Sequence, residues 1–241
     1  MPLRVGFDLD GTVADMYFAL RREAIKLFGD AVMRAPVEAS KPQEAGKELS
    51  AAPRAEDETA SLSIQELHLT ARQQKQLWDH VKQIENFWNS LPELEPGIIA
   101  RIAKTARERR WEVIFLTTRP STKGDLVQLQ SQQWLEAHGF QYPSVYVVHR
   151  SRGKIADALA LDAFVDDRPE NCLDIAVESK AKVLLVWHGD LSQVPAGAKR
   201  LGVRAVSTIN EAVSILEQLD DIRSQPSTMR AIKRVLGVRT E

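Results

Sequence analysis

From Gly97 onward the chain alternates between short apolar runs and amphipathic stretches, a pattern that few folds accommodate. With one more run near the N-terminus, the apolar runs have the length of strands and lie at 3–8, 112–117, 144–148, 163–166, 182–187 and 203–206. The stretches between most of them have helical spacing. Strands that alternate with helices pair in parallel. The sequence therefore predicts an α/β fold, a Rossmann-like parallel sheet with helices on both faces.

An insertion separates the first predicted strand from this alternating region. A helix is expected at about 15–29, and another runs from Thr70, a plausible N-cap, to about Asn89. Between them, residues 34–63 are rich in Ala, Glu, Lys, Ser and Pro and contain almost no aromatic residues. Such a composition buries too little apolar surface to offset the cost of ordering, so a mobile loop is expected there.

The first predicted strand ends in two closely spaced carboxylates, within the sequence DLDGT at residues 8–12. Residues two apart share a face of a strand, and the backbone curls beyond the last pair, so Asp8 and Asp10 can converge on one point. Gly11 allows the chain to pass close to a ligand, and the amides of residues 11–13 can then point at an anion. This arrangement suits a phosphate held beside a magnesium ion.

Three further polar signals follow in a fixed order. The run at 112–117 leads into TTRP at residues 117–120, Lys154 opens a helical stretch, and the run at 163–165 leads into DDRP at residues 166–169. In open parallel sheets, ligands bind beyond the carboxyl ends of the strands, so these residues are expected in one pocket. On these residues the chain resembles the haloacid dehalogenase superfamily. Its four motifs are a DxDGT loop, a strand-terminal Thr or Ser, a Lys, and a strand-terminal acidic pair.

The resemblance implies a magnesium-dependent phosphatase that acts through an aspartyl-phosphate intermediate. Asp8 would attack phosphorus, and Asp10 would protonate the leaving alcohol and later take a proton from water. Thr117 and Lys154 would each bind a phosphate oxygen, with Thr118 as an alternative to Thr117.

A metal site is implied by the same motifs. The expected ligands are Asp8, the backbone carbonyl of Asp10, and Asp166 and Asp167, one of which binds through water. Which member of the acidic pair contacts the metal directly is left open. Oxygen ligands of this kind favour Mg²⁺ over zinc, and the five His residues show no metal-binding spacing.

In the superfamily, an insertion in this place acts as a cap over the pocket. The resemblance therefore implies a core of residues 1–13 and 96–222, a helical cap of 14–95 with a flexible segment near 34–63, and a C-terminal tail helix of 223–241.

Residues expected at the substrate come from both core and cap: Gly11, Thr12, Thr118, Arg119, Phe18 and Trp88. An aromatic ring in the cap could stack on a nucleobase. Asp15 and the sequence Phe87-Trp88 resemble the 5'(3')-deoxyribonucleotidase-like branch of the superfamily, whereas TTRP departs from the Thr-Ser-Pro seen in nucleotidases of animal type. A nucleoside monophosphate is thus one candidate substrate.

Composition limits the partners and the compartment. The net charge of −1 argues against binding of a nucleic-acid polymer, and the expected partner is a small phosphorylated substrate. The lone Cys172 excludes an intrachain disulfide framework and fits a reducing compartment. No signal peptide and no apolar run of membrane-spanning length is visible, so no membrane association and a cytoplasmic location are expected.

Two alternatives to a phosphatase stay open. A phosphotransferase or phosphomutase of the same fold would pass the phosphoryl group to an acceptor other than water. A non-catalytic binding protein could also retain the fold, although a binding protein has no need of Asp10. A dehalogenase needs no second acid either, so Asp10 favours phosphoryl chemistry.

Overall fold

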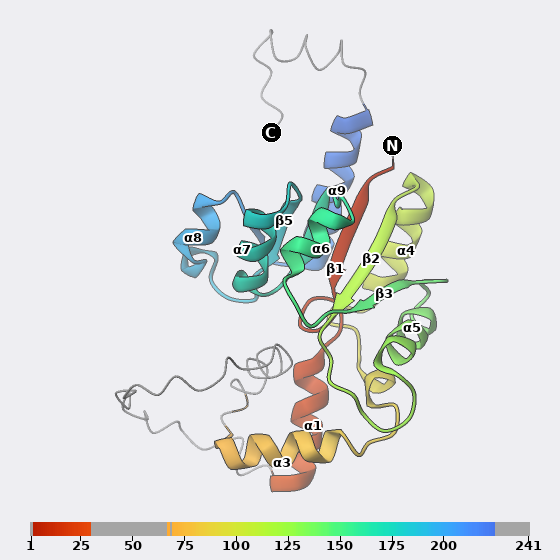
Figure 1. Ribbon diagram of the computed structural model, residues 1–241, viewed down its shortest axis with the longest axis vertical. Coiled ribbons are helices and arrows are strands. Elements are labelled where there is room, and N and C mark those ends of the chain that lie inside the picture. Colours follow the sequence, from red (N-terminus) through yellow and green to blue (C-terminus); the bar gives the residue numbers. More distant parts are fainter. Residues whose placement is uncertain (1, 30–66, 68, 225–241) are drawn as a thin grey trace.

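The computed structural model describes residues 2–29, 67 and 69–224. Within these residues the strands form one six-stranded parallel sheet in the order β3-β2-β1-β4-β5-β6 (Figure 1). The strands are β1 (Arg4–Asp8), β2 (Glu112–Thr117), β3 (Ser144–Val147), β4 (Ala163–Asp166), β5 (Lys182–Val186) and β6 (Arg204–Val206). This sheet confirms the predicted α/β fold class.

Helices connect the strands and cover both faces of the sheet (Figure 1). They are α1 (Met16–Phe28), α3 (Ala71–Val81), α4 (Ile98–Arg109), α5 (Val127–Ala137), α6 (Arg152–Ala158), α7 (Pro169–Glu178), α8 (Ala196–Arg200) and α9 (Ile209–Ser224), with the 3₁₀ turns η2 (Phe87–Ser90) and η3 (Leu191–Gln193). The sequence pattern did not predict η3 and α8. The predicted boundary between residues 222 and 223 falls inside α9.

The second helix of the insertion is shorter than its sequence pattern predicts. It begins as expected at a Thr70 capping box, but it ends at Val81 instead of continuing to Asn89. Asn86 lies in the left-handed region, its backbone N donates to the Lys123 carbonyl at 2.8 Å, and its Oδ1 accepts from the Asp125 backbone N at 2.8 Å. Contacts with the loop after β2 thus override the helical periodicity.

Side chains along each strand point alternately to the two faces of the sheet. Val5 and Phe7 belong to the apolar cluster that packs with α4, α5 and α9, whereas α6, α7 and α8 pack on the opposite face. Gly6 points to that opposite face, where a Cβ would lie only 2.3 Å from the Phe164 ring, so a larger residue does not fit. Because residues two apart share a face, Asp8 points to the side on which α6 lies.

The described part of the insertion lies beyond the carboxyl end of β1, where α1 and α3 cross (Figure 1). Asp15 caps α1 by accepting a hydrogen bond from the Phe18 backbone N at 2.8 Å. Leu20 of α1 and Leu77 of α3 are buried in a cluster continuous with the core, and the half-buried Trp78 packs against it. The segment 34–63, predicted to be mobile, lies outside the described residues, as does most of the predicted tail helix.

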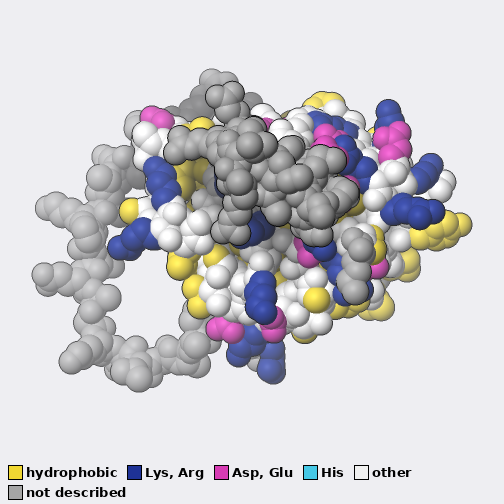
Figure 2. All heavy atoms as spheres, turned by 90° about the horizontal axis from the view of Figure 1, so that it is seen from above, with side chains coloured by type: hydrophobic (Ala, Val, Ile, Leu, Met, Phe, Trp, Pro, Cys, Tyr) yellow, Lys and Arg dark blue, Asp and Glu magenta, His cyan; other side chains and the backbone are white. Residues whose placement is uncertain are grey.

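The opposite end of the sheet is seen from above in Figure 2. Among the described residues visible there, Lys and Arg side chains are interspersed with acidic and apolar ones and gather in no single patch. Among the described helices, none combines the length and the apolar character needed to cross a membrane.

Candidate active site

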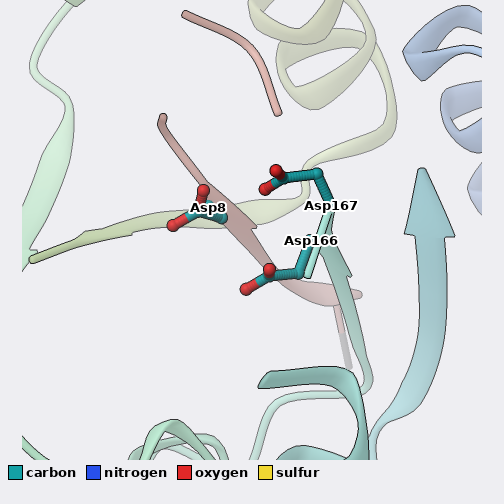
Figure 3. A group of neighbouring side chains, drawn as sticks. All are labelled: Asp8, Asp166 and Asp167. Atoms are coloured by element: carbon teal, nitrogen blue, oxygen red, sulfur yellow. The ribbon is translucent and has the colours of Figure 1, made fainter. Parts of the chain in front are cut away.

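Three carboxylates meet at the carboxyl ends of β1 and β4. The register pairs Phe7 with Val165, so the next residues, Asp8 and Asp166, lie side by side, and Asp167 follows directly. One oxygen from each of the three lies within 4.8 Å of the others (Figure 3). The strand order reverses between β1 and β4, which is where open α/β sheets bind their ligands.

Burial disfavours charge on these three groups. It raises the pKa of Asp8 to about 7, although the nearby Arg152 guanidinium acts in the opposite direction. Burial likewise raises the pKa of Asp166, and it raises that of Asp167 well above its usual range with help from Asp8 and Asp166. Three carboxylates share one nearby guanidinium, so a further cation would stabilise their charged forms.

Arg152, and not Lys154, is the basic residue at this cluster. Its Nη1 lies 2.5 Å from Asp8 Oδ1 and 3.0 Å from Asp166 Oδ2. Lys154 is exposed, and the structure does not bring its side chain to the carboxylates. The reason is helix geometry: Ser151 caps α6, and residues two apart on a helix point in directions about 200° apart. The helical period shows only that the two basic residues point in different directions, so the sequence alone does not tell which of them faces the carboxylates.

The acidic pair is held unequally. Asp166 accepts hydrogen bonds from Asn171 Nδ2 at 3.0 and 3.1 Å and from the Arg168 backbone N at 2.9 Å, in addition to the contact with Arg152. Asp167 accepts one from Thr12 Oγ1 at 2.9 Å. The start of α7 thus fixes Asp166, while the loop after β1 fixes Asp167.

Gly11 and Thr12 support the carboxylates. Gly11 has a φ of +85°, and a Cβ there would lie 2.4 Å from Asp167 Oδ2, so the close approach expected to a ligand is made to a side chain. The Gly11 and Val13 amides donate to the Ala14 and Leu9 carbonyls within the loop, contrary to the prediction that they point at an anion. The Thr12 hydroxyl lies 3.3 Å from Asp8 Oδ2 as well as 2.9 Å from Asp167 Oδ1.

Asp10 has a separate environment. Thr117 Oγ1 donates to Asp10 Oδ2 at 2.9 Å, and Arg119 Nε lies 2.9 Å from both carboxylate oxygens. Arg119 is only 2 % exposed and directs its guanidinium to Asp10, and its contact with substrate stays a prediction. The Thr117 hydroxyl is directed to Asp10, and its role as a phosphate ligand stays a prediction. Thr118 is buried at the next position and stays the alternative prediction.

Of the two aromatic residues expected at the substrate, the structure leaves one exposed. Trp88 is fully buried, its Nε1 donates to the Pro120 carbonyl at 3.0 Å, and its ring packs against Arg119, so it does not offer a stacking surface. Phe18 is 50 % exposed on α1 and stays a candidate. Asp15, which supported the nucleotidase resemblance, is accounted for as the N-cap of α1.

Comparisons with known proteins give matches to the fold only. No family model and no curated protein sequence matches the chain. Among solved structures, a predicted phosphatase from Clostridium acetobutylicum matches with a TM-score of 0.52 at 14 % identity, covering 90 % of this chain and 99 % of that one. An HAD family hydrolase from Deinococcus radiodurans, whose structure contains bound phosphate and sodium, matches with a TM-score of 0.52 at 13 % identity, covering 90 % and 96 %. A dehalogenase in an intermediate complex matches with a TM-score of 0.52 at 11 % identity, covering 89 % and 96 %.

These likenesses define the class of fold. The chain has the fold of haloacid dehalogenase-like hydrolases, and its carboxylate cluster lies at the switch point of that fold's sheet. They do not support the deoxyribonucleotidase-like branch in particular.

Proposed function

We propose that this protein is a phosphohydrolase that cleaves a small phosphate monoester through an aspartyl-phosphate intermediate. One observation carries the proposal: Asp8 lies at the switch point of the sheet beside Arg152 and two further carboxylates, with a second acid two residues along the same loop. A nucleophile, a source of positive charge and a proton donor thus lie at or just beyond the carboxyl end of β1.

In the first step, a carboxylate oxygen of Asp8 attacks phosphorus and the bond from phosphorus to the ester oxygen breaks. Asp10 donates its proton to the departing oxygen, so the alcohol leaves neutral. Arg152 touches Asp8 directly and reduces the repulsion between the carboxylate and the incoming phosphate.

In the second step, water attacks the phosphorus of the aspartyl phosphate. Asp10, now ionised, takes a proton from that water, and the bond from phosphorus to the Asp8 oxygen breaks. Inorganic phosphate leaves, Asp8 is restored as a carboxylate and Asp10 as an acid.

The residues present fit a magnesium ion. Asp8, Asp166 and Asp167 offer hard oxygen donors within reach of one another, and a cation among them would favour the charged forms that burial disfavours. The backbone carbonyl of Asp10 stays a predicted fourth ligand. A bound Mg²⁺ would supply positive charge that stabilises the phosphoryl group as negative charge develops on it.

For the substrate, a nucleoside monophosphate stays one candidate class. The half-exposed Phe18 offers a ring for a base, whereas Trp88 does not. Turnover of nucleoside monophosphates and of sugar phosphates by the wild type and by Phe18→Ala would test this. A selective loss with the nucleotides is expected if Phe18 contacts the base, and equal losses would contradict it.

The central test is phosphate release from an aryl phosphate in the presence of Mg²⁺. Asp8→Asn should abolish turnover while circular dichroism shows a folded protein. Asp157→Asn, a matched change at an exposed position of α6, should keep wild-type turnover. Retained turnover in Asp8→Asn would rule out the aspartyl-phosphate route.

A further inference from the structure

Arg119 is a buried cation to which the steps above assign no role. Its Cζ lies 5.0 Å from the centroid of the Trp88 ring and 6.0 Å from that of the Trp134 ring, and its Nη1 donates to Ser131 Oγ at 2.9 Å. Trp88 belongs to η2, at the end of the insertion, and the other two residues belong to α5. Two separate elements therefore hold the guanidinium in place.

The two indole rings are themselves fixed. Trp88 Nε1 donates to the Pro120 carbonyl at 3.0 Å, and Trp134 Nε1 donates to the Leu91 carbonyl at 2.7 Å. Both rings are buried. Each ring thus has its polar atom satisfied by backbone and its face available to Arg119, so the guanidinium has little freedom to turn.

The other side of the guanidinium faces Asp10. Besides the Nε contacts with both carboxylate oxygens, Nη2 lies 2.8 Å from Oδ1. Nη2 makes no hydrogen bond, so that contact is ionic. Both side chains are almost fully buried, and an ion pair in such a place adds little net stability once desolvation is counted. What it does provide is one defined orientation for the carboxyl group.

We infer that Arg119 is a positioning residue, which, held by Trp88, Trp134 and Ser131, orients Asp10 for proton transfer to the leaving oxygen. The inference rests on the proposed phosphohydrolase function. It assigns Arg119 no contact with substrate, and it connects the end of the insertion to the proton donor through the Trp88 ring.

This role predicts a dependence on the leaving group. A basic alkoxide needs a proton as it departs, whereas a phenolate stabilised by a nitro group leaves without one. The value of kcat/KM reports steps up to the first irreversible one, so slow hydrolysis of the aspartyl phosphate does not mask the effect. The informative quantity is therefore the ratio of kcat/KM for an alkyl phosphate to that for para-nitrophenyl phosphate.

The experiment measures this ratio for the wild type, Arg119→Lys and Ser131→Ala with saturating Mg²⁺. Lysine keeps the charge but lacks the planar fork that contacts both oxygens. We expect the ratio to fall roughly 10- to 100-fold in Arg119→Lys, since misplacing a catalytic group costs rates of this order. Ser131→Ala removes one contact to Nη1 and should lower the ratio in the same direction by about twofold to fivefold.

Two variants control for loss of stability. Arg101→Lys alters another arginine that joins two elements, through Asn210 and Ser214 of α9. Thr105→Val removes a buried hydroxyl that donates to Glu217 at 3.2 Å. The stability of each variant is measured by thermal unfolding, and both variants should leave the ratio at the wild-type value even where the melting temperature falls.

The possible results distinguish a failure of the inference from a failure of the proposed function. An unchanged ratio in a folded Arg119→Lys variant would overturn the inference while leaving the phosphohydrolase function intact. Equal losses on both esters through KM are one way in which the ratio would stay unchanged. A wild-type protein that releases no phosphate from any ester would overturn both. Should Arg119→Lys fail to fold, Ser131→Ala decides: a lowered ratio supports the inference and an unchanged ratio overturns it.

Discussion

Two aspartates in one loop, Asp8 and Asp10, occupy opposite electrostatic environments. Asp8 shares Arg152 with Asp166 and lies near a third carboxylate, so negative charge is in excess around it. Asp10 has Arg119 to itself and accepts a further hydrogen bond from Thr117. The comparison shows how one short sequence can supply two carboxyl groups with different tasks: the first is placed to attract cations and the second to keep an orientation.

The largest effect is expected from removing the cation beside Asp8. Arg152→Gln should lower kcat/KM on an aryl phosphate by roughly 100-fold or more, because the guanidinium no longer offsets the repulsion between Asp8 and the phosphate. Lys154→Gln, two residues along the same helix, should stay close to wild type because Lys154 is exposed. Equal losses in the two variants would contradict the assignment of Arg152.

Metal binding should depend on the carboxylate cluster of Asp8, Asp166 and Asp167. We expect Asp167→Asn to weaken Mg²⁺ binding by roughly 10- to 100-fold in titration calorimetry, an effect of the size seen when groups that support a metal site are removed. Asp174→Asn, a change of the same kind at a carboxylate that accepts from Ser151 and the Gly153 amide, lies outside the cluster and should bind Mg²⁺ as the wild type does. Unchanged affinity in Asp167→Asn would exclude that residue as a ligand.

A third effect concerns pH and stability without metal. The pKa of Asp8 is about 7 in the folded protein and 3.8 is its ordinary value, so the folded state binds the proton more tightly. The free energy of unfolding should therefore fall as the pH rises from about 4 to about 7. Urea unfolding in the presence of a chelator would measure this fall, and Asp8→Asn should reduce it. A fall of the same size in wild type and in Asp8→Asn would contradict the raised pKa of Asp8.

The smallest of these effects is expected at Gly11, which joins the two environments. Gly11→Ala places a Cβ at a φ of +85° and against the Asp167 carboxylate, so it should lower the free energy of unfolding by about 1–3 kcal/mol. Thermal unfolding would measure the loss. Gly29→Ala, which has a positive φ of 76° but no atom within 4 Å of its Cβ, is the matched control and should lose less.

Much of the fold follows from local patterns. The predicted strands agree with β1 to β6 to within about a residue at each end, because apolar runs of strand length between helical stretches leave few other ways to bury them. Asp8, Asp166 and Asp167 were placed together correctly because carboxyl ends of parallel strands share one edge. Local patterns fail where distant contacts act: the helix expected to reach Asn89 ends at Val81, next to contacts made by the loop after β2.

The sequence by itself determined the parallel sheet and the edge of that sheet at which Asp8, Asp166 and Asp167 meet. Only the tertiary structure decided that Arg152 and not Lys154 reaches Asp8, that Arg119 turns inward to Asp10, and that Trp88 is buried against it. The physical reason is distance along the chain. Periodicity and turn chemistry act between near neighbours, whereas each of these contacts depends on how elements pack that lie tens of residues or more apart in the sequence.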